Sequence, residues 1–112
     1  LDYVRSVTPH FQERLAEFRA SPIVGEARGV GLIGALELVM DKSTRDQYPP
    51  DIKAGAQVAA AALAKGLIVR ALPGDVIGIC PPLIITKEQI DELFDALALA
   101  VSETENLLKQ AA

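Results

Sequence analysis

The fold is decided by residues 23–40, which read IVGEARGVGLIGALELVM. Apolar side chains recur at every second position through much of this stretch, which is typical of a β-strand with one buried face. The face expected to be buried carries Val30, Leu32, Leu36, Leu38 and Met40. Glycine tolerates positive φ, so the chain can reverse near Gly29 or Gly31. The stretch therefore predicts two antiparallel strands.

A helix is expected after the polar loop at residues 41–50. Asp51 is positioned to cap it, and Gly66 suits the position just after its last turn. Many alanines favour the helix and allow close packing. Its expected inward face carries Ile52, Gly55, Val58, Ala59, Ala62 and Leu63.

Two further strands are predicted at residues 67–70 and 76–80, separated by a turn at Pro73-Gly74. Both are short apolar runs bounded by turn residues. Two strands joined by so short a connection pair with each other as a local hairpin.

Amphipathic helices are predicted at both ends of the chain. Pro9 predicts a kink in the first helix or a start at Thr8, and Ser21-Pro22 ends it. Thr86 followed by Gln89 matches a capping box at the start of the last helix. The first helix is expected to bury Val4, Val7, Phe11, Leu15 and Phe18. The last is expected to bury Ile90, Leu93, Phe94, Leu97, Val101 and Leu108.

This order of elements predicts an α+β fold in which a small antiparallel (or mixed) four-stranded sheet carries its helices on one face. Residues 1–112 form a single domain by this prediction, since 112 residues is an ordinary domain length. The other face of the sheet would be bare and lined by small or apolar residues such as Ile33, Ala35 and Gly78. A bare face of this kind usually packs on another domain or subunit.

Composition excludes several classes of protein. Half of the residues are hydrophobic, which excludes a disordered chain. The net charge is −4 and no cluster of Lys or Arg appears, so no nucleic-acid partner is expected. No apolar stretch approaches the roughly 20 residues of a membrane helix, so no membrane partner is expected. The lone Cys80 fits a reducing compartment, and we expect a cytoplasmic location.

No catalytic residue, metal ligand or cofactor-binding residue is predicted within this chain. His10 has no orienting partner or pocket near it in the sequence, so we interpret it as a surface or partly packed histidine. Cys80 is interpreted as a small buried hydrophobic residue. Gly29, Gly31 and Gly34 do not form a phosphate loop, because an apolar strand continues through them.

None of the lysines is expected to form a Schiff base, because each lies in a polar loop or on an exposed helix position. A reactive lysine needs an apolar setting that lowers its pKa. The lysines are Lys42, Lys53, Lys65, Lys87 and Lys109.

Two charged residues lie in apolar strands. Arg70 ends a predicted strand beside the Pro73-Gly74 turn. Its guanidinium there either binds a carboxylate through two parallel hydrogen bonds or faces solvent. Glu37 either pairs with Arg28 or Arg70 or faces water.

Four segments in a fixed order carry a family resemblance: residues 24–38 (VGEARGVGLIGALEL), 66–70 (GLIVR), 74–77 (GDVI) and 81–86 (PPLIIT). Together they resemble the C-terminal small domain of class-III aminotransferases, which are fold-type I enzymes dependent on pyridoxal phosphate. The resemblance covers nearly the whole chain.

The resemblance implies an amino-group transfer between a small-molecule amino donor and a keto acid, with pyridoxal 5'-phosphate as cofactor. In this family the catalytic lysine and the phosphate site belong to the large domain. The chain begins at Leu1 inside a helical pattern, and we interpret it as a fragment that is inactive and binds no cofactor alone. The implied partners are that missing large domain and further copies of the full-length chain, as a homodimer or tetramer. The small domain's implied role is to close over the active site.

The resemblance also implies that Arg70 binds the substrate carboxylate, as in family members that use pyruvate and an amine or ω-amino acid. A second branch, the ornithine and acetylornithine type, places its arginine just before the Pro-Pro motif, where this chain has Gly78. This difference favours the pyruvate branch. The alternatives are an aminotransferase of the ornithine or 4-aminobutyrate type, which uses 2-oxoglutarate, and a free-standing α+β interaction or oligomerisation module.

Overall fold

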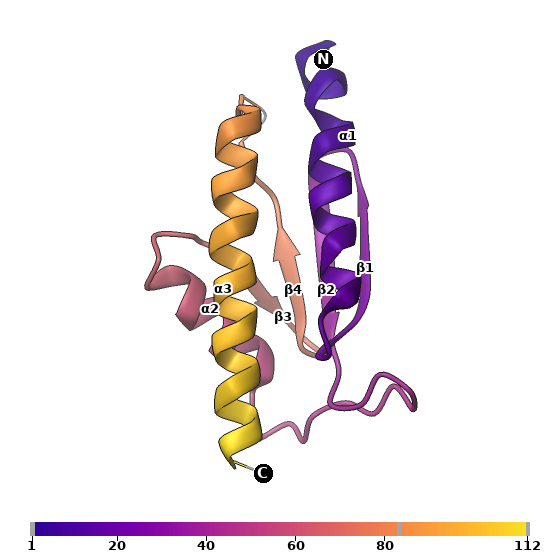
Figure 1. Ribbon diagram of the computed structural model, residues 1–112, viewed down its shortest axis with the longest axis vertical. Coiled ribbons are helices and arrows are strands. Elements are labelled where there is room, and N and C mark those ends of the chain that lie inside the picture. Colours follow the sequence, from indigo (N-terminus) through magenta and orange to yellow (C-terminus); the bar gives the residue numbers. More distant parts are fainter. Residues whose placement is uncertain (1, 83, 112) are drawn as a thin grey trace.

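The computed structural model describes residues 2–82 and 84–111 (Figure 1). A long helix begins the chain, a second long helix ends it, and a four-stranded sheet and a shorter helix lie between them. The elements are α1 (Asp2–Ala16), η1 (Glu17–Ala20), β1 (Val24–Val30), β2 (Ile33–Leu38), α2 (Ala54–Leu63), β3 (Arg70–Leu72), β4 (Val76–Ile79) and α3 (Lys87–Ala111).

The sheet has the order β1-β2-β4-β3, and every neighbouring pair is antiparallel. The turn between β1 and β2 contains Gly31, whose φ is 60°. This is a backbone conformation that glycine adopts without steric cost. The predicted α+β class and four-stranded sheet are therefore confirmed, and the sheet is antiparallel throughout.

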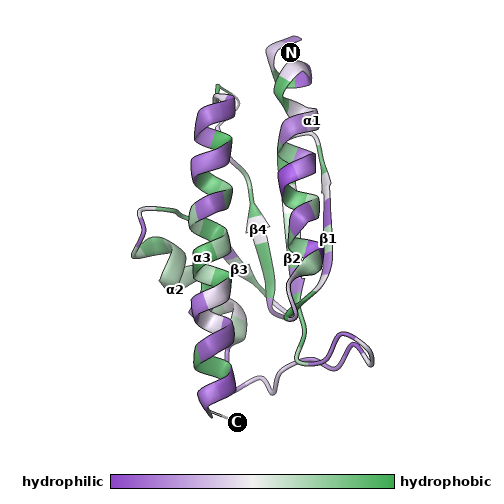
Figure 2. Cartoon of the chain, in the orientation of Figure 1, coloured by the Kyte–Doolittle hydropathy of each residue, from purple (hydrophilic) through white to green (hydrophobic). Residues whose placement is uncertain are grey.

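The helices cover one face of this sheet. α1 and α3 run side by side in front of the strands, and α2 packs against α3 beside β3 (Figure 1). Apolar and polar residues alternate along both long helices (Figure 2), and the residues that these helices bury are almost all apolar. The core they enclose includes Val7, Phe11, Leu15, Ala27, Leu36, Val58, Ile77, Ile90, Phe94, Leu97 and Val101.

Three aromatic rings join α1 and η1 to α3. Phe94 of α3 is fully buried, and its ring meets that of Phe11 edge-on with the centroids 5.1 Å apart. The ring of Phe18 lies 5.9 Å from that of Phe94. Aromatic pairs of this kind add to the free energy gained by burying the rings, so the two helices are held together at this level.

The first turn of α3 is a capping box, as predicted. The backbone N–H of Gln89 donates to Thr86 Oγ1 at 3.1 Å, and the backbone N–H of Thr86 donates to Gln89 Oε1 at 3.0 Å. Each side chain therefore satisfies a backbone donor that the helix itself leaves free.

The predicted cap of α2 is wrong. Asp51 lies in a turn, and α2 begins after Lys53, whose φ is 53° and whose side chain makes no capping hydrogen bond. The carboxylate that serves this helix comes from another part of the chain, since Asp75 Oδ1 accepts the backbone N–H of Gly55 at 3.0 Å. This bond ties the start of α2 to the β3–β4 turn.

The third strand is also displaced from its predicted position. It spans Arg70–Leu72 rather than residues 67–70, because only these residues lie opposite β4. The preceding segment is still closing α2, as the backbone N–H of Leu67 donates to the carbonyl of Ala62 at 3.0 Å. Arg70 therefore begins a strand on the edge of the sheet instead of ending one.

Smaller corrections concern residues at the ends of elements. α1 runs through Pro9 and does not start at Thr8. Leu63, at the last position of α2, is exposed. Val30 was expected to be buried but is 83% exposed at the hairpin tip. Met40 was also expected to be buried but is exposed, because the alternation of buried and exposed residues ends where Leu38 and Val39 are both buried.

In the described part of the chain, no helix combines the length and the apolar character needed to cross a membrane.

Candidate functional site

The sheet face opposite the helices carries a row of four aligned residues. Arg28, Ala35, Gly78 and Arg70 are successive cross-strand partners on β1, β2, β4 and β3. Side chains at cross-strand partners project to the same face of a sheet. The row therefore has an arginine on each edge strand and two small residues between them.

Arg28 is neutralised by two glutamates on the same face. Its Nη1 lies 3.2 Å from Glu26 Oε2 and 3.7 Å from Glu37 Oε2. Glu37 therefore pairs with Arg28, which settles one of the alternatives that the sequence left open. Half of the Arg28 side chain is exposed, so these pairs contribute little to stability. Their consequence is that the positive charge of Arg28 is offset locally, and the two carboxylates leave this cluster with a net negative charge.

Arg70 is exposed on the edge strand β3, and no residue in the described part of the chain forms a hydrogen bond or ion pair with its side chain. Opposite it, Gly78 offers no side chain that would cover the guanidinium. A guanidinium in this setting keeps its five N–H donors available for an incoming anion, and its planar fork matches a carboxylate.

The same face is apolar near the β1–β2 turn. A shallow hollow of about 340 Å³ lies there, lined by Arg28, Gly29, Val30, Ile33, Gly34 and Ala35. Ile33 is 62% exposed. An open sheet face that combines apolar residues, an arginine already paired with two glutamates, and a second arginine without an ion-pair partner among the described residues can bind both an apolar surface and a carboxylate.

The lysines do not fit the attachment of pyridoxal phosphate within this chain. All five are exposed, and Lys65 and Lys109 are in ion pairs with Glu103 and Glu105. Exposure leaves an amine without the apolar surroundings that lower its pKa for Schiff-base formation. Among residues 2–82 and 84–111, no group of three His, Cys, Asp or Glu side chains could hold a metal ion.

His10 has an orienting partner that the sequence analysis missed. Its Nε2 lies 2.7 Å from Asp91 Oδ1, which also accepts a hydrogen bond from Arg14 Nη1 at 2.7 Å. Arg14 Nη2 donates to Asp95 as well. The available signal was spacing: His10 and Arg14 are four apart on one helix, and Asp91 and Asp95 are four apart on the other.

This cluster shifts two pKa values. Hydrogen bonds from Arg14 and then from His10 lower the pKa of Asp91. Burial alone would lower the pKa of Arg14, but its hydrogen bonds to Asp95 and Asp91 outweigh burial and raise the pKa. Both shifts favour the charged forms, so the cluster is an ionic contact between α1 and α3 rather than a proton-transfer site.

Cys80 is exposed, contrary to the prediction that it is buried. The reason is the period of two in β4. Ile77 and Ile79 face the helices, so the next residue follows the alternation towards the other face.

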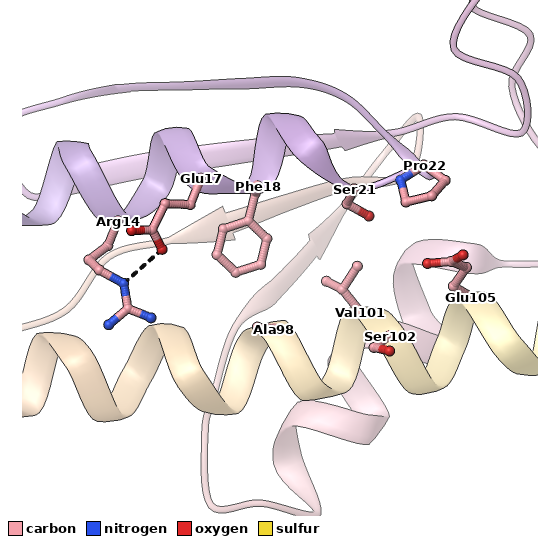
Figure 3. Close-up of a pocket in the computed structure, with 9 residues that line it drawn as sticks. All are labelled: Arg14, Glu17, Phe18, Ser21, Pro22, Ala98, Val101, Ser102 and Glu105. Atoms are coloured by element: carbon pink, nitrogen blue, oxygen red, sulfur yellow. Dashed lines mark hydrogen bonds and ion pairs between the residues drawn. The ribbon is translucent and has the colours of Figure 1, made fainter.

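A groove of about 240 Å³ lies between η1 and α3, in the helix layer (Figure 3). Arg14 Nε donates to Glu17 at its rim, and Ser21 Oγ is buried without a hydrogen-bond partner among the described residues. The groove contains no nucleophile beside a general base, so we assign it no chemistry. Its lining is Arg14, Glu17, Phe18, Ser21, Pro22, Ala98, Val101, Ser102 and Glu105.

Comparison with known proteins gives consistent results. An uncharacterized aminotransferase, y4uB, from Sinorhizobium fredii is 50% identical over 91 residues, which is 80% of this chain and 20% of that protein. A diaminobutyrate–2-oxoglutarate transaminase from Halomonas elongata is 42% identical over 101 residues, covering 88% of this chain and 22% of that protein. The chain thus spans about a fifth of the length of these curated relatives.

Solved structures agree in fold. An omega-transferase from Vibrio fluvialis superposes with a TM-score of 0.93 at 36% identity, covering 99% of this chain and 26% of that one. A PMP-bound aminotransferase from the same species gives a TM-score of 0.90 at 36% identity, covering 94% of this chain and 23% of that one. The family model described as aminotransferase class-III matches residues 1–101. The chain therefore belongs to the class-III aminotransferases.

Proposed function

We propose that the whole protein is a pyridoxal-phosphate-dependent aminotransferase that moves an amino group from an amine or ω-amino acid to a keto acid, with pyruvate as the acceptor. The chain described above supplies recognition of the substrate carboxylate through Arg70. The cofactor and its lysine are assigned to the rest of the protein, because all five lysines of this chain are exposed. The match of the aminotransferase class-III family model to residues 1–101 favours an enzyme over a free-standing interaction module.

The observation that carries the proposal is the contrast between the two arginines of the open-face row. Arg28 is paired with two glutamates, whereas Arg70 has no ion-pair partner in the described part of the chain. The positive charge of a paired guanidinium is already offset by its partner. An unpaired guanidinium therefore gains more free energy from binding an anionic ligand. Arg70 is therefore the better carboxylate anchor of the two.

The same contrast favours a keto acid with a single carboxylate. Pyruvate has one carboxylate and 2-oxoglutarate has two, while among the described residues the open-face row offers one guanidinium without an ion-pair partner. At Gly78, where the resemblance implies an arginine in the 2-oxoglutarate branch, there is no side chain. The second candidate is the 2-oxoglutarate type, and the name of the Halomonas elongata relative supports it.

The open face also accounts for the proposed partner. We assign it to contact with the large domain, which places Arg70 at the boundary between the two domains. Assembly of the full-length protein as a homodimer or tetramer and its cytoplasmic location rest on the sequence interpretation alone and stay predictions.

The test uses Arg70→Ala and Arg70→Lys in the full-length protein, with the two half-reactions measured separately. Loss of a hydrogen bond to a charged group costs about 1.5–3 kcal/mol, so kcat/KM for pyruvate should fall roughly ten- to hundredfold. Lysine should restore only part of this loss, because it lacks the bidentate fork. The half-reaction of an amine without a carboxylate should change much less.

Arg28→Ala is the matched control, since Arg28 ends the same row but is already paired. It should leave kcat/KM for pyruvate nearly unchanged. Equal losses in both half-reactions of Arg70→Ala, or no loss in either, would contradict the proposed role of Arg70. A preference of the unmodified protein for 2-oxoglutarate over pyruvate would favour the second candidate.

A further inference from the structure

Asp75 connects the β3–β4 turn to a helix and to a central strand. Its Oδ1 accepts the backbone N–H of Gly55 at 3.0 Å, in the first turn of α2. Its backbone carbonyl accepts the N–H of Leu38 at 3.0 Å, at the end of β2. One residue therefore fixes the turn to α2 through its side chain and to β2 through its backbone.

Both partners of the bond between Asp75 and Gly55 are shaped for a close contact. The φ of Asp75 is 56°, in the left-handed region that residues with a Cβ seldom adopt and that aspartate adopts more readily than most. A Cβ at Gly55 would lie 3.3 Å from the Cα and 3.3 Å from the Oδ1 of Asp75. The absence of a side chain at Gly55 therefore lets the turn approach the helix.

The start of α2 depends on this carboxylate. Lys53, at the N-cap, makes no capping hydrogen bond with its side chain. The carboxylate of Asp75 supplies an acceptor to a backbone N–H of the first turn, and its negative charge lies at the positive end of the helix dipole. The attraction thus holds the turn against the helix as well as capping it.

The strand that this turn carries has little else to hold it. β3 is three residues long, all of them exposed, and it lies at the edge of the sheet with β4 as its neighbouring strand. Two strands joined by a turn are only marginally stable unless they pack against further structure. The position of β3, and with it that of Arg70, therefore depends on how firmly the turn is attached to α2 and β2.

We propose that Asp75 is a positioning residue, because its contacts with α2 and β2 hold the β3–β4 hairpin in the one orientation that presents Arg70 at the open face. This inference rests on the proposed role of Arg70. The Asp75 side chain is directed at α2, so it acts through the hairpin and does not touch the substrate. Without this bond the hairpin samples several orientations, and ordering it on binding costs part of the affinity for a carboxylate.

The test introduces Asp75→Ala and Asp75→Asn in the full-length protein, with the two half-reactions measured separately. Asp75→Ala should lower kcat/KM for pyruvate roughly three- to tenfold, mainly through KM, because the guanidinium is still present but less well placed. The half-reaction of an amine without a carboxylate should stay within about twofold. Asp75→Asn should behave nearly as the unmodified protein, since its amide oxygen can accept the Gly55 N–H and asparagine tolerates positive φ.

Gly55→Ala tests the same contact from the side of the helix. Its Cβ would press on Asp75, so it should reproduce the selective rise in KM for pyruvate. Asp51→Ala is the matched control, because Asp51 is an exposed aspartate in the turn before α2 and does not cap the helix. It should leave both half-reactions unchanged.

A double variant separates this inference from the proposed function. If Asp75 acts through Arg70, then Asp75→Ala should have almost no further effect on pyruvate once Arg70 is alanine, because the two changes are coupled. Full additivity, equal losses in both half-reactions of Asp75→Ala, or a normal KM for pyruvate would overturn the role of Asp75 while leaving that of Arg70 intact. A normal Arg70→Ala enzyme would instead overturn the proposed function itself.

Discussion

Replacing Gly34 by alanine tests whether the helices pack on only one face of the sheet. Gly34 lies on β2, with its missing side chain directed at α1. A Cβ there would lie 2.9 Å and 3.1 Å from the two methyl groups of Leu15, and 3.5 Å from Phe11 Cε1. Leu15 and Phe11 are 2% and 0% exposed, so neither can move into solvent. Overpacking of this kind costs about 1–3 kcal/mol.

Gly78→Ala is the matched substitution on the open face. Its Cβ contacts are longer and end on exposed side chains, and alanine restricts the unfolded chain more than glycine does. The free energy of unfolding should therefore change by no more than about 0.5 kcal/mol. Urea unfolding of the 112-residue chain, followed by circular dichroism, compares the two variants. Equal losses, or a larger loss for Gly78→Ala, would refute the packing of the helices on one face.

Three further predictions concern the isolated chain. Because hydrogen bonds lower the pKa of Asp91 in the folded state, the stability that Asp91 contributes is fully present above the ordinary carboxyl pKa of about 3.9. This contribution is lost as the pH falls through the lower pKa of the folded state. Asp91→Asn should therefore make the free energy of unfolding fall less steeply below about pH 4, as measured by denaturant titrations. Added pyridoxal phosphate should give no stoichiometric imine, and borohydride reduction that maps to a single lysine would contradict the assignment of the cofactor to the rest of the protein. The open face should drive self-association at high concentration, and light scattering that shows a strict monomer would count against an interface there.

Local patterns predicted those parts of the fold that depend on neighbours in sequence. Alternation identified β2 and β4 because each buries one face against the helices, and the Thr86–Gln89 spacing identified the start of α3 because a capping box is complete within four residues. The order of the elements then limited the fold to a sheet with one covered face.

The errors lie where a distant segment decides the outcome. The sequence pattern predicted Asp51 as the cap of α2, but Asp75 supplies the carboxylate from the β3–β4 turn, 20 residues away from its partner Gly55. His10 meets Asp91 across 81 residues. The third strand is limited to the three residues that find partners on β4, which no local propensity encodes.

The candidate site was predictable only in part. The family resemblance named Arg70 as a candidate and the strand pattern predicted an open face, but neither placed Arg28 and Arg70 at the two ends of one row. That alignment requires the register of all four strands. The pairing of Glu37 with Arg28 is likewise visible only in the structure, and it leaves Arg70 as the arginine of this row that has no ion-pair partner among the described residues.

The most direct test of the central claim is a crystal structure of the full-length protein with a carboxylate-bearing substrate analogue bound. The account predicts that Arg70 donates two parallel hydrogen bonds to that carboxylate, each about 2.7–2.9 Å between nitrogen and oxygen, with its side chain beside Gly78. A carboxylate held by another residue while Arg70 points into solvent would contradict the account.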